Sequence, residues 1–251
     1  MAIISGDRWV KLRTVFNMRD LGGLPTADGR RVRPGRLFRA DNLGRLEAAD
    51  KETFMALGIR TVIDLRRLSE VETMGKVPEW TGVTWLHHHL DHELWDHRTY
   101  SDAIGVTRWL ADRYADLLTS GAADIARVVM LLSEVDSGPT VVHCVAGKDR
   151  TGLVAALTLS LLGVPDDHIA EDYAMTELSE EAYMDWLRRT NPTAAAKTPP
   201  PFYVQTPAET MRLTLAELRE RHGSVFQYLA RHGVSRVHVE RMRAALVESF
   251  A

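Results

Sequence analysis

The pattern of apolar and polar positions predicts strands that alternate with helices along most of the chain. Short runs rich in valine and isoleucine predict buried strands at residues 59–65, 83–86 and 139–142. Longer stretches with apolar residues three and four apart predict helices at residues 46–57, in two segments between 103 and 134, at 151–162, 166–176 and 179–189, and in two C-terminal segments ending near 221 and 250. This alternation is typical of an α/β chain.

Aromatic residues in the predicted helices have the same apolar spacing as their aliphatic neighbours. In the segment between 103 and 120, Trp109 and Tyr114 share a face with Leu110, Leu117 and Leu118. Because packing against the core explains this spacing, we assign these side chains to the core and infer no cofactor there.

Two regions depart from the alternation. Residues 13–40 form an N-terminal strand region of short strands and turns, with a hairpin signal at Asp28-Gly29. Asn191–Gln205 breaks every helical and strand pattern and contains three consecutive prolines. A loop of this length in a compact domain is often a lid, so residues 179–206 are a candidate lid. A surface linker with aromatics anchored in the core is the equal alternative.

Composition narrows the class of protein. With 251 residues, a net charge of −3 and one cysteine, the chain fits a single α/β domain spanning 1–251, without an internal disulfide. The balanced charge gives no case for nucleic acid as a partner. We expect no integral membrane association, because no apolar run approaches the length of a span. The N-terminus lacks a signal-peptide pattern, so we expect a cytoplasmic protein, with signal-less export and the oligomeric state left open.

The chemistry concentrates in the Cys144 loop, which we define as residues 143–152. It joins a predicted strand to a predicted helix, so successive backbone N–H groups are expected to line one concavity that suits an anion. The helix N-terminus and a nearby arginine favour the thiolate form of Cys144. Arg150 supplies a planar fork that holds two phosphate oxygens. The loop therefore predicts phosphoryl transfer without a metal.

The loop also resembles a known family. His143-Cys144-x5-Arg150-Thr151-Gly152 is similar to the signature loop of the cysteine-dependent protein tyrosine phosphatases. The second half of the loop, Gly147–Gly152, is similar to that of the bacterial atypical branch of this family, which also acts on phosphoserine, phosphothreonine and phosphoinositides. Further similar segments are Asn17–Gly23, Leu37–Asp41 and Val62–Arg66. The resemblance covers most of the chain from about residue 15, and it implies the family's fold, a central mostly parallel sheet flanked by helices.

The resemblance implies a mechanism. Cys144 attacks phosphorus to form a cysteinyl-phosphate, Arg150 binds the phosphate, and Asp149 serves as the general acid within the loop. Many tyrosine phosphatases take that acid from an upstream loop, where Asp91 or Asp96 is the nearest candidate. The alternative role of Asp149 is to pair with Lys148 or Arg150 and order the turn.

The resemblance also indicates binding and supporting residues around the loop. We expect no cofactor and no metal. The substrate-binding group comprises Val145, Ala146, Gly147, Lys148 and Thr151, of which Lys148 is the candidate headgroup contact and Thr151 the hydroxyl that assists thiolate departure. His143 is expected to order the loop. Asp64 and Arg66, at the carboxyl end of a predicted strand, either approach the loop or form a local surface ion pair. Arg39 lies in the segment Leu37–Asp41, which resembles the same family. The expected partner is a phosphorylated protein or a phosphoinositide.

Two other functions fit parts of the sequence. His87 to His92 spells H-x-H-x-D-H, the ligand spacing of dinuclear zinc hydrolases. The later ligands of such sites have no clear counterparts downstream, where His143 already belongs to the Cys144 loop. Alternatively, the loop binds phosphate without turnover. Such modules usually have an altered nucleophile or arginine, whereas Cys144 and Arg150 are both present.

Overall fold

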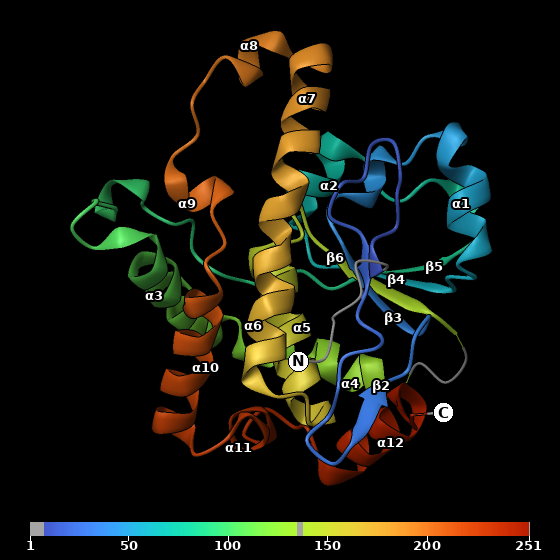
Figure 1. Ribbon diagram of the computed structural model, residues 1–251, viewed down its shortest axis with the longest axis vertical. Coiled ribbons are helices and arrows are strands. Elements are labelled where there is room, and N and C mark those ends of the chain that lie inside the picture. Colours follow the sequence, from blue (N-terminus) through green and yellow to red (C-terminus); the bar gives the residue numbers. More distant parts are fainter. Residues whose placement is uncertain (1–7, 135–137, 251) are drawn as a thin grey trace.

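A computed structural model describes residues 8–134 and 138–250, and its centre is a five-stranded sheet (Figure 1). The strand order is β1-β3-β6-β4-β5. Their bounds are β1 Arg19–Asp20, β3 Leu37–Ala40, β6 Thr140–His143, β4 Thr61–Asp64 and β5 Thr84–His87. The last four are parallel, and only β1 runs antiparallel, to β3. The predicted mostly parallel sheet is therefore confirmed.

Both faces of this sheet are buried. Neighbouring residues of one strand point to opposite faces, so Val62 packs in one apolar cluster and Ile63 in the other. Val141 and Val142 divide in the same way. Because both faces need apolar side chains, the central strands read as continuous apolar runs rather than as alternating ones.

Helices cover the two faces unequally. The smaller cluster includes Phe54 of α1 (Lys51–Ala56). The larger cluster is built by α3 Gly105–Ser120, α4 Ala122–Glu134, α5 Asp149–Leu162, α6 Asp166–Ala174, α10 Ala208–His222, α11 Val225–Ala230 and α12 Arg236–Leu246. Within it, α10 packs against α3 and α6, and α12 packs against α4 and α5.

The predicted helix over residues 46–57 is wrong in its first half. The chain forms two 3₁₀ turns, Leu43–Arg45 and Ala48–Asp50, before α1 begins at Lys51. The buried carboxylate of Asp50 accepts a hydrogen bond from the backbone N–H of Arg13, 2.7 Å away. This tertiary contact holds the turn at Asp50 and prevents one continuous helix.

The predicted C-terminal helix that ends near residue 250 is also too long. It ends at Leu246, and residues Val247–Ser249 form β7, which pairs antiparallel with β2 (Arg30–Val32). Val32 and Val247 are buried, and Arg31 is ion-paired with Glu248. The hairpin predicted at Asp28-Gly29 precedes β2, and Gly29 has the positive φ of 78° that such a turn favours.

The candidate lid is partly helical. After α6 the chain forms a 3₁₀ turn, Met175–Ser179, and then α7 Glu180–Thr190, α8 Pro192–Ala195 and α9 Pro201–Val204. In Figure 1, α7 extends away from α6, α8 lies at its far end, and the chain returns through α9 to α10. No described helix combines the length and apolar character that crossing a membrane requires.

Candidate functional site

The Cys144 loop has the predicted strand–turn–helix context. Cys144 directly follows β6, and α5 begins at Asp149. Gly147 has a φ of 67°, and a Cβ atom there would lie 2.6 Å from the Ala40 carbonyl oxygen. Only glycine permits this turn without strain and allows the loop to approach the end of β3 so closely.

Three successive carbonyl groups of the loop are held from outside by the N-terminal region. Their donors come from residues 17, 39 and 42, on or next to β1 and β3. The bonds are Asn42 N–H to Val145 O at 3.1 Å, Asn17 Nδ2 to Ala146 O at 2.9 Å and Arg39 Nη2 to Gly147 O at 2.7 Å.

These bonds orient the opposite side of each peptide. The peptides are trans, so each N–H points away from the carbonyl of the same unit. The N–H groups of Ala146, Gly147 and Lys148 are thus turned away from the N-terminal region and toward the concave side of the loop. This arrangement is suited to binding an anion, and Asn17 and Asn42 contribute to it although sequence reasoning gave them no role.

Arg39 is itself held by a buried carboxylate. Asp172 of α6 contacts three guanidinium groups, Arg39 at 2.7 Å, Arg8 at 2.8 Å and Arg19 at 3.1 Å. Burial alone would raise the pKa of Asp172, but the surrounding positive charges hold it well below its usual value. Asp172 lies in a predicted helix without any motif, so no sequence signal marked it.

Replacing Asp172 with asparagine is expected to destabilise the protein by about 3–5 kcal/mol, because buried guanidinium groups lose their counter-charge. Since the pKa of Asp172 is lowered on folding, this stabilisation is full above the unfolded pKa near 3.8 and is lost as the pH falls below it. Urea unfolding at pH 7 and pH 3 measures the difference, which should be smaller at pH 3. Asp185→Asn, which removes the surface pair with Arg188, is the control and should change stability by less than about 1 kcal/mol. A similarly small effect of Asp172→Asn would contradict this account.

Arg150 is oriented by a residue that the sequence did not indicate. Its guanidinium forms a bidentate pair with Glu70 of α2 (Leu68–Met74), at 2.6 and 2.9 Å, and donates to the Leu65 carbonyl at 3.3 Å. Burial disfavours the charged form, but the negative charges of Cys144 and Glu70 outweigh it and raise the pKa of Arg150 above its usual value. Arg150 therefore stays cationic and its planar fork is fixed in direction.

Asp64 and Arg66 form a fully buried pair, joined at 2.6 Å, so the surface ion pair considered from the sequence is wrong. Arg66 also donates to Asn42 Oδ1 at 2.8 Å, the residue whose N–H holds the loop. Asp64 Oδ2 lies 3.4 Å from Nε2 of buried His143. His143 Nδ1 lies 3.2 Å from the Cys144 carbonyl. These contacts connect the end of β4 to the loop.

Asp149 lines the same cavity as Cys144, whereas Asp91 and Asp96 do not. The Tyr114 hydroxyl donates to Asp149 Oδ1 at 2.7 Å. Asp96 is exposed, and its hydrogen bonds from Arg98 lower its pKa to about 2. Geometry thus favours Asp149 as the acid over the two upstream candidates.

Lys148 and Thr151 occupy different environments. Lys148 Nζ donates to the Phe202 carbonyl in α9 at 2.5 Å, and burial lowers the pKa of its amine. It lines the cavity and tethers the candidate lid. Thr151 is fully buried, and its hydroxyl has no hydrogen-bond partner among the described residues.

A cavity of about 680 Å³ opens over the Cys144 loop. Its floor contains Cys144, Val145, Ala146, Lys148, Asp149 and Arg150. More than half of its lining residues come from residues 176–204, and those outside this segment and the Cys144 loop come from the N-terminal region, Glu70 and the loop around Trp95. The wall is rich in aromatic side chains, including Phe16, Tyr183 and Phe202.

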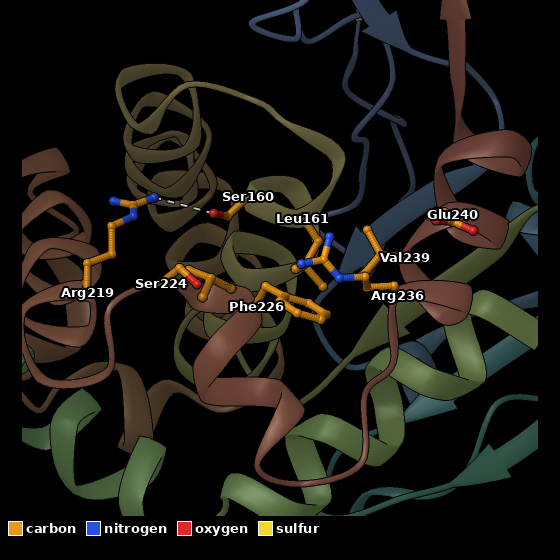
Figure 2. Close-up of a pocket in the computed structure, with 9 residues that line it drawn as sticks. Ser160, Leu161, Arg219, Ser224, Phe226, Arg236, Val239 and Glu240 are labelled. Carbon is orange, nitrogen blue, oxygen red and sulfur yellow. Dashed lines mark hydrogen bonds between the residues drawn. The ribbon is translucent and has the colours of Figure 1, made fainter.

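A second cavity, of about 390 Å³, lies at the opposite end of α5 (Figure 2). Arg219 there binds Asp166 at 2.7 Å and points toward Ser160, while Arg236 lies over the ring of Phe226. None of the Cys144 loop residues lines this cavity, whereas Cys144, Asp149 and Arg150 line the first. We therefore place the candidate active site at the Cys144 loop.

The histidine-rich segment does not form a metal site in the structure. Among the described residues, no group of three or more histidine, cysteine, aspartate or glutamate side chains is arranged to hold a metal ion. His87 stacks on Trp85 and its Nε2 lies 2.8 Å from the Arg66 carbonyl, whereas His92 contacts Arg67. The ligand spacing in the sequence is thus not matched by converging side chains.

In sequence, the chain is similar to known phosphatases. A model of the tyrosine phosphatase family matches residues 10–248. The triple specificity protein phosphatase PtpB of Mycobacterium tuberculosis is 30% identical over 277 aligned positions, which cover 94% of this chain and 98% of that protein. A Cupriavidus necator protein provisionally described as a tyrosine-protein phosphatase is 33% identical over 178 positions, covering 68% and 64%. A crystal structure provisionally described as a phosphatase, from Neisseria meningitidis, is 21% identical, covers 61% of this chain and 92% of that one, and has a TM-score of 0.33.

Proposed function

Since this chain belongs to the tyrosine phosphatase family and is a cysteine-dependent phosphatase, we propose that Cys144 is its nucleophile, Arg150 its phosphate clamp and Asp149 its general acid. The observation that carries this assignment is the convergence of all three on one cavity. Three backbone N–H groups turned toward the concave side of the loop, together with the fixed guanidinium, are suited to the charge of a phosphoryl group.

The proposed reaction has two steps. The Cys144 thiolate attacks phosphorus, the bond from phosphorus to the ester oxygen breaks, and Asp149 gives its proton to the leaving oxygen. In the second step a water attacks the cysteinyl-phosphate, Asp149 takes the water's proton, and phosphate and thiolate are released. The buried Thr151 hydroxyl, which has no other described partner, is proposed to stabilise the departing thiolate.

We assign broad specificity for phosphate monoesters, including phosphotyrosine, phosphoserine or phosphothreonine, and phosphoinositides. The relative named a triple specificity phosphatase supports this range. The cavity is larger than one phosphorylated ring needs, since about 680 Å³ falls well inside the range for drug-sized ligands. Lys148 uses one of its three N–H donors for Phe202, so two remain for a second anionic group.

Residues 179–206 are proposed to act as a lid within one domain that spans 1–251. The segment supplies much of the cavity wall, yet α7 contains no fully buried residue and is therefore weakly anchored. Its described anchors include the bond between Lys148 and Phe202, and the stacking of Arg45 on Tyr183 and Trp186. A cytoplasmic location, which would keep the Cys144 thiol reduced, remains a prediction.

A direct test compares kcat/KM on a phosphotyrosine peptide, a phosphothreonine peptide and phosphoinositide micelles, using one enzyme preparation. All three substrates should be hydrolysed. Lys148→Ala should lower the phosphoinositide rate several-fold relative to the phosphotyrosine rate, because a multiply charged headgroup gains more from an extra cation.

Lys197→Ala, which removes a different cavity-lining lysine, is the matched control for charge. An unchanged ratio in Lys148→Ala would assign Lys148 to holding the lid alone. Binding of all three ligands without release of phosphate would instead favour the phosphate-recognition module.

A further inference from the structure

Asp149 is joined to two buried tyrosines that no motif indicates. Tyr114 lies on α3 and Tyr173 on α6, and both side chains are almost completely inaccessible to solvent. The Tyr114 hydroxyl donates to Asp149 Oδ1 at 2.7 Å, and the two tyrosine hydroxyls lie 2.6 Å apart. The three groups form a continuous hydrogen-bonded chain that ends at the cavity.

The hydrogen bonds among these three groups run in one direction, from Tyr173 through Tyr114 to Asp149. A tyrosine hydroxyl carries a single proton, and that of Tyr114 is given to Asp149. The hydrogen bond between the two hydroxyls must therefore use the proton of Tyr173. Burial, reinforced by the negative charge of Asp149, raises the pKa of each tyrosine above its usual value. Both hydroxyls thus remain protonated donors over the pH range in which a phosphatase works.

A carboxyl group that is held in this way has two unequal oxygens. Oδ1 is fixed as the acceptor for Tyr114, so the transferable proton of Asp149 belongs on Oδ2. We propose that Tyr114, supported by Tyr173, is a positioning residue that orients the Asp149 carboxyl for proton transfer to the leaving group. This inference rests on the proposed role of Asp149 as general acid and adds the two residues through which that role is organised.

The contact also fixes the direction of a half-buried side chain at a helix start. Asp149 is the first residue of α5, where side chains ordinarily rotate into solvent. The carboxyl must stay within hydrogen-bonding reach of the ester oxygen, and a misplacement of about 1 Å can cost about 100-fold in rate. Two rigid aromatic side chains packed in the main core, with ring centroids 6.0 Å apart, provide a stiffer support than a flexible surface partner.

The test measures kcat/KM, which reports the steps up to transfer of the phosphoryl group to Cys144, on two esters, phenyl phosphate with a poor leaving group and 2,4-dinitrophenyl phosphate with a good one. Tyr114→Phe keeps the ring and removes the donor, so it should lower kcat/KM on phenyl phosphate by about 10-fold or more and leave kcat/KM on the other ester within about 2-fold. Tyr173→Phe should give a smaller loss with the same dependence on leaving group.

Tyr228→Phe is the matched control. Tyr228 is also buried and donates to the Leu118 carbonyl at 2.6 Å, but it lies outside the cavity. Its removal should not alter the ratio of the two rates. A Tyr114→Phe enzyme that slows both esters equally, or neither, would overturn the inference.

Combination with Asp149→Asn separates this inference from the proposed function. If Tyr114 acts through Asp149, then Tyr114→Phe should cause no further loss on phenyl phosphate in the Asp149→Asn background. If Asp149→Asn alone lowers both rates equally, the acid assignment fails and the inference fails with it. If Asp149→Asn is selective for phenyl phosphate while Tyr114→Phe is not, only the role of Tyr114 is wrong. Should Tyr114→Phe fail to fold, the same comparison is made with Tyr173→Phe.

Discussion

Replacement of Cys144 by serine is expected to lower turnover of an aryl phosphate by about 10⁴-fold or more, because a neutral hydroxyl is a far weaker nucleophile than a thiolate. The backbone N–H groups of the loop and the guanidinium of Arg150 remain in place, since their supports lie in other elements. Binding of inorganic phosphate, measured by calorimetry, should therefore stay within a few-fold of wild type.

Arg150→Ala provides the contrast, since it should weaken both turnover and phosphate binding. Thermal unfolding of each variant checks that Glu70, which loses its partner in Arg150→Ala, has not destabilised the fold. Wild-type activity should persist in EDTA. Substantial activity of Cys144→Ser, or full loss in EDTA restored by zinc, would contradict the cysteine mechanism and return attention to the histidine-rich segment.

Asp149→Asn is expected to lower kcat/KM on phenyl phosphate by about 10²- to 10⁴-fold, the usual contribution of a general acid. The effect on 2,4-dinitrophenyl phosphate should be small, because that leaving group departs as an anion without a proton. The amide keeps the size of the side chain and still accepts from Tyr114, so the local structure is preserved. The measurement is the slope of log kcat/KM against leaving-group pKa, which should become steeper.

Asp96→Asn is the control for this prediction. Asp96 lies outside the cavity and binds Arg98 on the surface, so its loss should leave the slope unchanged. A steeper slope in Asp96→Asn, together with an unchanged one in Asp149→Asn, would move the acid to the upstream loop. Equal losses on good and poor leaving groups in Asp149→Asn would assign Asp149 a purely structural role.

The sequence by itself determined those features of the protein that depend on residues close together along the chain. The Cys144 loop depends on contiguous residues, because its concavity follows from a strand, a glycine with positive φ and a helix start in immediate succession. The central strands β4 and β6 were predicted for the same reason, since apolar β-branched runs need burial on both faces wherever they occur.

Tertiary structure alone decided which distant residues support the loop. Glu70 lies 80 positions before its partner Arg150, and Tyr114 lies 35 positions before Asp149. Asp172 lies 133 positions after its partner Arg39, which in turn holds the loop. A lone glutamate, aspartate or tyrosine in a helical pattern is compatible with a surface or core position. Its role emerges only when packing brings its polar atom within 3 Å of a partner.

The same reason accounts for the corrected elements. The end of α12 at Leu246 depends on β2, more than two hundred residues earlier, and the break before α1 depends on the bond from Arg13 to Asp50. Local propensity favoured helix at both places, but a buried carboxylate and an open strand edge each gain more from a tertiary hydrogen bond than from another helical turn. The residues that carry out the chemistry are thus contiguous in the sequence, whereas the orientation of their side chains depends on contacts that only the folded structure creates.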